Sequence, residues 1–194
     1  MCTNGNKGTG DREMTSEKLA ATRVIEQHNA SDIVGVTDVV FLGHPDGGLE
    51  DTMLFRSQVT REIRRFKPDL ILCIDPYRSI SHTHRDHRKS GQVALDAAFS
   101  YAWSYQHFPE QITEEGLEPH RVEQAFLWGG EEPDVFVDIQ SYMDVKADSL
   151  GAHVSQMSSD REQRLERIKT NSGRHKEKTG LDYAEGFRRI TFNL

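Results

Sequence analysis

The feature that most constrains the fold is an apolar run that gives way abruptly to a histidine-rich polar stretch. Leu70–Ile74 is apolar throughout, which is typical of a buried strand. The polar stretch His82–His87 follows it, and Arg88–Phe99 then carries the apolar spacing of a helix. A strand, a loop and a helix in this order place the loop at the carboxyl edge of a sheet, where open α/β folds bind ligands. The sequence therefore predicts an α/β fold with a candidate site at this loop.

The side chains of this loop are those that bind zinc and similar metals. His84 and His87 lie about one helical turn apart, so both imidazoles can face one point, and Asp86 lies between them. A catalytic zinc site usually takes about three protein ligands, which this loop alone does not supply. The alternative is a solvated loop that caps the next helix, with Asp86 near the positive helix N-terminus. The loop by itself leaves both interpretations open.

Length and charge limit the class of protein. A chain of 194 residues fits one domain, and we expect a single domain over residues 1–194. The net charge of -7 argues against a nucleic-acid partner held by phosphate electrostatics. The mean hydropathy is -0.66, and no apolar run approaches the roughly 18 residues that a membrane span needs, so we expect no transmembrane segment.

The two cysteines, Cys2 and Cys73, give no disulfide framework, which suits a reducing compartment. The first residues also lack the charged and apolar regions of a signal peptide. We therefore expect a cytoplasmic protein in which Cys73 is an inert core residue.

The rest of the chain alternates between helical and strand patterns. We expect helices over residues 15–29, 55–66, 88–105 and 142–153 and from Ser159 onward, where Ser159 and Glu162 form a capping-box pattern. We expect strands over residues 36–42, 70–74, 124–128 and 134–139, and an irregular connection over residues 107–118. Strand, helix and strand in succession predict a mostly parallel sheet with right-handed crossovers.

Two further polar residues follow the predicted strand over residues 36–42. His44 and Asp46 lie at its end, although Pro45-Asp46-Gly47 is also an ordinary turn signal.

A series of short segments resembles one known family, the zinc-dependent N-deacetylases of the LmbE and PIG-L type. The matching segments are Asn4–Thr9, Arg23 with Glu26, Phe41–Gly43, Asp46-Gly47, Lys67–Asp69, His84–His87, Leu95–Ala98 and His153–Gln156. The resemblance implies a Rossmann-like fold, with helices on both faces of a mostly parallel sheet. It also implies a hydrolase that removes the acetyl group from an N-acetylglucosamine-containing glycoconjugate or glycolipid, with Zn²⁺ or another divalent metal as cofactor.

The same resemblance implies a role for each matching residue. His87 would be a metal ligand, and His84 would act as general acid or stabilise the oxyanion. Asp86 would orient a histidine from behind. Arg23 and Asp46 would contact the sugar, although Arg23 also fits a salt bridge on a helix surface.

One element of the family pattern has no counterpart in this sequence. Members of the family begin with a strand that ends in Ala-His-Pro-Asp-Asp, which supplies two zinc ligands and the general base. No such strand precedes Met1, and His44-Pro45-Asp46 matches the downstream substrate loop instead. We therefore expect a chain that is truncated at its N-terminus relative to the family, lacks its first strand and is inactive alone.

Two other functions remain open at this point. The first is a Rossmann-like sugar-binding module without catalysis. The second is a different metal-dependent hydrolase, for instance a phosphoesterase, whose site combines residues from three parts of the chain: His44, Asp46, Asp75, His84 and His87.

Overall fold

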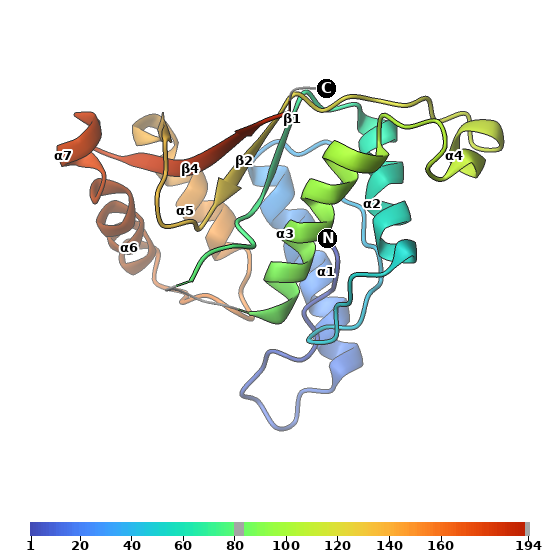
Figure 1. Ribbon diagram of the computed structural model, residues 1–194. Helices are drawn as coiled ribbons and strands as arrows, with labels where there is room; N and C mark the ends of the chain where they lie inside the picture. Colours follow the sequence, from blue (N-terminus) through green and yellow to red (C-terminus); the bar gives the residue numbers. More distant parts are fainter. Residues whose placement is uncertain (80–83, 193–194) are drawn as a thin grey trace. The chain divides into compact units, whose positions relative to one another are not determined.

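The computed structural model describes residues 1–79 and 84–192 (Figure 1). His82, which the sequence grouped with the candidate site, lies outside these residues. The described helices are α1 (Ser16–Ile33), α2 (Met53–Phe66), α3 (Arg85–Asp96), the π-helix η1 (Ala97–Tyr101), α4 (Pro109–Thr113), the 3₁₀-helix η2 (Gln140–Tyr142), α5 (Met143–Gly151), α6 (Arg161–Gly173) and α7 (Lys176–Thr179). The described strands are β1 (Leu70–Ile74), β2 (Gln124–Trp128), β3 (Val135–Asp138) and β4 (Ala184–Thr191).

The chain divides into two compact units. Unit 1 consists of Met1–Gly47 and Phe136–Glu185, and unit 2 consists of Gly48–Val135 and Gly186–Leu194. The expectation of a single domain over residues 1–194 stays a prediction.

The sheet confirms the α/β class and is mixed. Its strand order is β1-β2-β4-β3. β1 and β2 are parallel, with Leu70 opposite Gln124 and Ile74 opposite Trp128, so their carboxyl ends lie at the same edge. β4 runs antiparallel to β2, with Thr191 opposite Gln124.

β1 has the predicted bounds but not the predicted burial. Leu72 is 62% exposed and Leu70 is 40% exposed, whereas Cys73 and Ile74 are buried. The apolar run is therefore not a fully buried strand, because β1 stands at the end of the strand order. Burial raises the pKa of the Cys73 thiol to about 12, with Asp75 as a smaller cause, which agrees with its interpretation as an inert core residue.

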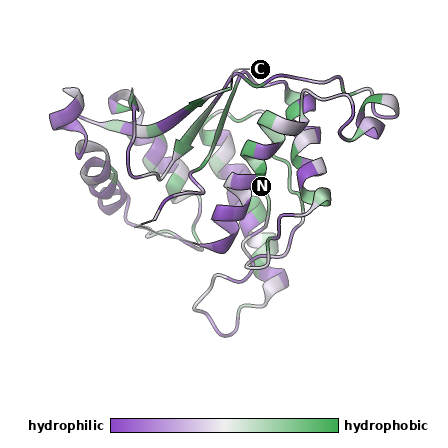
Figure 2. Ribbon diagram, in the orientation of Figure 1, coloured by the Kyte–Doolittle hydropathy of each residue, from purple (hydrophilic) through white to green (hydrophobic). Residues whose placement is uncertain are grey.

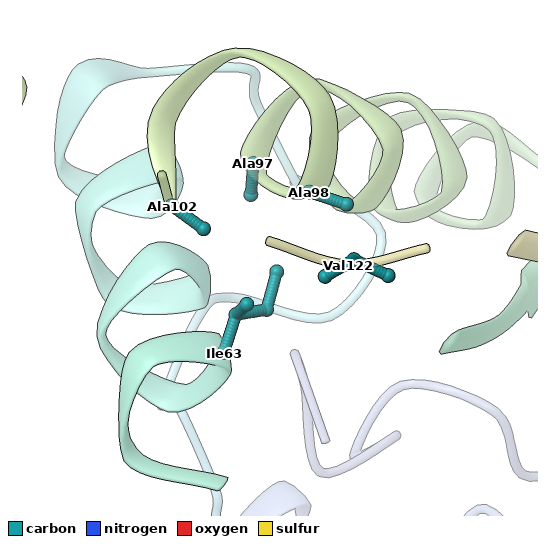
Figure 3. Close-up of a cluster of buried hydrophobic side chains, with 5 residues drawn as sticks. All are labelled: Ile63, Ala97, Ala98, Ala102 and Val122. Carbon is teal, nitrogen blue, oxygen red and sulfur yellow. The ribbon is translucent and has the colours of Figure 1, made fainter. Parts of the chain in front are cut away.

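The core of unit 2 joins α2, η1 with the residue that follows it, and Val122, which lies two residues before β2. Figure 3 shows how its side chains converge from these elements: Ile63, Ala97, Ala98, Ala102 and Val122. Small alanines on η1 allow the helices to approach closely. α3 also lies close to β1, because a Cβ at Gly91 would stand 2.3 Å from the backbone oxygen of Ile74. This close approach brings the middle of α3 against the end of β1.

Unit 1 is built on α1, α5 and α6. Its core cluster consists of Ile139, Met143, Ala147 and Ile168. Thr15 caps α1 by accepting a hydrogen bond from the Lys18 N–H at 3.3 Å. The strand predicted over residues 36–42 is wrong: none of these residues is assigned to a strand. The segment and the residues after it do bond to the short Met1-Cys2 stretch, through Leu42 N to Met1 O at 2.9 Å and His44 N to Cys2 O at 3.0 Å.

Other predicted boundaries changed for local reasons. The residue that caps α6 is Asp160 and not Ser159, because the Asp160 carboxylate accepts the Gln163 N–H at 3.1 Å. The helix that follows the histidines ends at Tyr101, and α4 occupies part of the connection predicted to be irregular. β4 was not predicted, because Glu185, Gly186 and two arginines interrupt its apolar pattern.

Within residues 1–79 and 84–192, no helix combines the length and hydropathy needed to cross a bilayer. Figure 2 shows the contrast between the apolar β1 and β2 and the strongly hydrophilic α6.

Candidate functional site

The first turn of α3 orients His84. His84 is the N-cap residue of α3, and its Nδ1 accepts a hydrogen bond from the Asp86 backbone N–H at 3.2 Å. An imidazole nitrogen that accepts a hydrogen bond carries no proton, so in neutral His84 the ring proton lies on Nε2. His84 is therefore held as an N–H donor at the nitrogen that points away from the helix backbone.

Asp86 is buried in the same turn, with 6% of its surface exposed. Its Oδ1 accepts the Leu49 backbone N–H at 3.1 Å. The neighbouring Arg85 donates to the Leu49 carbonyl oxygen at 3.3 Å. Leu49 is itself almost fully buried, so this pair of bonds attaches the segment around it to the start of α3. The hydrogen bond that Asp86 accepts therefore fixes the backbone of Leu49 beside the turn that carries His84 and His87.

His87 faces aromatic and cationic neighbours. Its ring centroid lies 5.2 Å from that of His84 and 6.3 Å from that of Trp128. The Nη2 of Arg78 lies 3.4 Å from its Nδ1. Because a guanidinium has only donors, this contact is a hydrogen bond when Nδ1 is unprotonated. That arrangement places the proton of a neutral His87 on Nε2.

Asp75 follows β1 directly and is committed to an ion pair. It is 4% exposed, and its two oxygens accept from Arg188 Nε and Nη2 at 3.0 Å each. Its Oδ1 also accepts the Tyr77 N–H at 2.9 Å. Hydrogen bonding to Asp75 raises the pKa of Arg188, which keeps the guanidinium positively charged. A carboxylate enclosed in this way is a poor metal ligand, which weighs against the hydrolase that would use Asp75.

The described residues do not fit a zinc ion as they stand. Across residues 1–79 and 84–192, no group of three or more His, Cys, Asp or Glu side chains is placed to hold a metal. Asp75 is paired with Arg188, and a zinc-bound Nε2 of His87 would need its proton on Nδ1, where Arg78 already presents a donor. His87 as a metal ligand therefore stays a prediction, and no reaction step is derived through the metal.

Arg23 and Asp46 lie in unit 1 and hold a glycine-containing loop. Arg23 donates through Nη1 to the carbonyl oxygen of Gly5 and through Nη2 to that of Gly8, the second at 2.6 Å. Asp46 Oδ2 accepts the Lys7 N–H at 2.8 Å. Gly5 has φ +66°, a conformation that favours glycine. The two residues predicted to contact the sugar, Arg23 and Asp46, thus act together on one loop. Among the described residues, no hydrogen-bond partner lies at the buried Nε of Arg23.

Glu26 and the segment His153–Gln156, which the family pattern also includes, meet in unit 1. Glu26 is buried, and its carboxylate accepts the Ser155 N–H at 2.6 Å and the Ser155 hydroxyl at 2.8 Å. This match in the sequence therefore corresponds to a contact that fastens the turn after α5 to α1.

The structure thus brings the predicted residues together in two groups. His84, Asp86 and His87 share the start of α3 in unit 2, whereas Arg23 and Asp46 share a loop in unit 1. Sequence reasoning missed Arg78 and Trp128 beside His87. Trp128 ends the strand parallel to β1, so the rule that carboxyl ends meet at one edge would have found it.

Comparisons with known proteins place these features in context. Residues 1–98 match the family model described as PIG-L, GlcNAc-PI de-N-acetylase. The chain is 30% identical over 189 residues to the diacetylchitobiose deacetylase of Thermococcus kodakarensis, a match that covers 97% of this chain and 70% of that protein.

Solved structures agree. N,N′-diacetylchitobiose deacetylase from Pyrococcus horikoshii, complexed with its inhibitor MPG, superposes with a TM-score of 0.88 at 27% identity, covering 98% of this chain and 71% of that one. The conserved protein TT1542 from Thermus thermophilus superposes with a TM-score of 0.76 at 26% identity, covering 96% and 78%. The hydratase GalB from Pseudomonas putida, at 21% identity and a TM-score of 0.77 and covering 100% and 85%, shares the fold alone.

Proposed function

Because this chain belongs to the PIG-L family of GlcNAc-PI de-N-acetylases and is a hydrolase of the N-deacetylase type, we propose that its substrate is an N-acetylglucosamine-containing saccharide of the diacetylchitobiose kind. The relatives that support this substrate are both diacetylchitobiose deacetylases, and both match over nearly the whole of this chain. The resemblance noted in the sequence implied the same class of substrate, a small N-acetylated amino-sugar conjugate.

The observation that carries the proposal is the orientation of His84. Amide hydrolysis develops negative charge on the carbonyl oxygen and then needs a proton on the leaving amine. A neutral imidazole with its proton on Nε2 can do both: it donates a hydrogen bond to the oxyanion and then transfers the proton to the amine nitrogen. The hydrogen bond from the Asp86 backbone N–H to Nδ1 favours the tautomer with its proton on Nε2. The His84 proton is therefore on Nε2 already in the protein without substrate.

Deacetylation is tested directly with N,N′-diacetylchitobiose. The purified chain, assayed in the presence and in the absence of added zinc, is expected to release acetate and expose a new amine, which a fluorogenic amine reagent detects. Cellobiose, which has no acetamide, serves as the binding control without a reactive group. Failure to release acetate while the acetamido sugar still binds would refute the deacetylase proposal for this chain.

That outcome would support the second candidate, a sugar-binding module without turnover. The specific observation that favours it is that the described residues supply too few metal ligands. This candidate predicts that sugar binding, measured by calorimetry, is unchanged by a chelator and by His87→Ala. It also corresponds to the sequence-based expectation of an inactive chain.

The assignment of His87 to a metal has its own measurement. Zinc affinity is determined by competition with a weak chelator for the wild type and for His87→Ala. If His87 is a ligand, the variant binds zinc at least about tenfold more weakly, because one metal bond is lost. Equal affinity in the two proteins would contradict the assignment.

A further inference from the structure

A cavity of about 390 Å³ in unit 1 is lined by residues that the proposed deacetylase reaction does not use. It lies between α5 and α6, and its lining contains no aspartate or glutamate: Lys146, Leu150, Met157, Ser158, Gln163, Arg164, Arg167, Ile168, Asn171 and Ser172. This volume falls in the usual range of small-molecule sites, about 300–1,000 Å³. The cavity is therefore large enough for a compact organic ligand.

The two arginines of this cavity form no ion pair with a carboxylate of the described residues. The pKa of the nearby Asp148 carboxyl is lowered mainly by its hydrogen bond with Arg161 and to a smaller extent by the charge of Arg164. Arg164 donates through Nε to the carbonyl oxygen of Ala147 at 3.2 Å and through Nη1 to that of Ser158, and both acceptors are uncharged. Within the described ranges 1–79 and 84–192, neither Arg164 nor Arg167 has a carboxylate within ion-pair distance. The guanidinium charges consequently remain available to a ligand.

The acidic residues of α5 are already committed elsewhere. Asp144 and Asp148 both pair with Arg161, each at 2.7 Å. Lys146, the third cation of the lining, pairs with Glu185. The positive charge of the cavity that has no ion-pair partner among the described residues is therefore that of Arg164 and Arg167.

The geometry of Arg164 holds its charge in place. A Cβ at Gly151 would stand 2.4 Å from Arg164 Nη2, so the guanidinium fills the space that a side chain at position 151 would need. An arginine fixed by backbone acceptors and by packing loses little entropy when it binds an anion. The cavity therefore has one preorganised cation and a second one, Arg167, in an exposed position.

The remaining lining determines what kind of anion fits. Leu150, Met157 and Ile168 are apolar, and Ile168 is 4% exposed. Gln163 and Asn171 add amide groups that donate hydrogen bonds. Arginine matches planar or tetrahedral oxyanions with paired N–H donors. We propose that this cavity binds a small organic oxyanion, a phosphate or carboxylate attached to an apolar group.

The test uses the full chain and calorimetry at fixed ionic strength with four probes. Phenyl phosphate and benzoate carry an apolar ring, whereas inorganic phosphate and acetate do not. We expect each ring-bearing probe to bind at least about tenfold more tightly than its small counterpart, since the ring gains apolar contact. Tighter binding of phenyl phosphate than benzoate identifies a phosphate site, and the reverse order identifies a carboxylate site. Binding of the small ions as tight as that of the ring-bearing probes would overturn the proposal.

Variants locate the binding in this cavity. Arg167→Gln is expected to weaken phenyl phosphate binding about tenfold, through the loss of a charge-assisted hydrogen bond. Asn171→Asp keeps the side-chain shape but places a negative charge in the lining, and it is expected to weaken binding by more than that. Arg12→Gln removes the same charge from an exposed residue outside the lining and is expected to change the affinity less than about twofold.

Circular dichroism melting verifies that each variant is folded. The proposal is overturned if Asn171→Asp binds phenyl phosphate as well as the wild type does. It is also overturned if Arg167→Gln and Arg12→Gln have equal effects. Neither result depends on deacetylase activity, so the deacetylase proposal stands or falls separately.

Discussion

In the Gly5–Gly8 loop of unit 1, the side chains of Arg23 and Asp46 hold the backbone, whereas at the start of α3 in unit 2 the backbone holds the side chain of His84. The Arg23 guanidinium is committed to two carbonyl oxygens. His84 is fixed through one nitrogen and keeps the proton on the other. Polar residues of the first kind contribute mainly to stability, and those of the second kind mainly to chemistry.

The largest expected effect is on turnover, at His84. His84→Ala removes the donor at Nε2 and is expected to lower kcat for diacetylchitobiose by about 10²–10⁴-fold, with little change in KM. The free energy of unfolding should fall by only about 1 kcal/mol, because one cap hydrogen bond is lost. Steady-state kinetics and urea unfolding measure the two quantities. A loss of stability with unchanged kcat would show that His84 contributes to stability and not to catalysis.

The second-largest expected effect is on the free energy of unfolding, and it compares Gly91 in unit 2 with Gly5 in unit 1. Gly91→Ala puts a methyl group against the rigid backbone oxygen of Ile74, and we expect a loss of about 3 kcal/mol in unfolding free energy. At Gly5 the nearest atom to a Cβ is the flexible end of Arg23, at 2.6 Å, but φ is positive. Gly5→Ala should therefore cost about 1–2 kcal/mol. Urea unfolding of both variants checks the order, and equal losses would contradict it.

A smaller effect is expected at Arg23. Arg23→Ala leaves the carbonyl oxygens of Gly5 and Gly8 without their donors, and it should cost about 1–2 kcal/mol of stability. Arg12→Ala, an exposed control with the same charge change, should stay within about 0.5 kcal/mol. Chemical unfolding distinguishes them. If Arg23→Ala weakens sugar binding without changing stability, Arg23 contacts the substrate rather than the loop.

The smallest expected effect is a difference in the rate of alkylation between the two cysteines, Cys2 in unit 1 and Cys73 in unit 2. Burial raises the pKa of Cys73 to about 12, so at pH 8 only about 10⁻⁴ of it is thiolate. Cys2 is partly exposed. Iodoacetamide should therefore modify Cys2 first and Cys73 only when unit 2 opens, as mass spectrometry of timed samples would show. Rapid labelling of Cys73 in the folded protein would contradict its burial.

Local patterns predicted most helices and three of the strands because their causes lie within a few residues. The cap at Thr15, the apolar spacing of α2 and the apolar runs of β1 and β2 need no distant partner. The segment over residues 36–42 failed for the opposite reason. Its β-branched residues favour a strand, but a strand also needs a partner strand, and the backbone bonds from Leu42 and His44 reach the short Met1-Cys2 stretch, which is not a strand.

The candidate site was only half predictable for the same reason. The sequence identified His84, Asp86 and His87 from their spacing and from the family resemblance. It could not reveal that Asp75 is enclosed by Arg188, 113 residues away, because nothing local to either residue indicates the other. Arg78 was also missed, since a lone arginine after a strand has no distinctive pattern.

The sequence by itself determined the fold class, the family and the histidine-bearing turn that follows β1, because periodicity, capping and motif order are written in neighbouring residues. Only the tertiary structure decided which distant residues each polar atom contacts. It assigned Arg23 and Asp46 to the Gly5–Gly8 loop and placed Arg78 beside His87. Such pairings depend on where the folded backbone brings distant residues together, which local sequence does not specify.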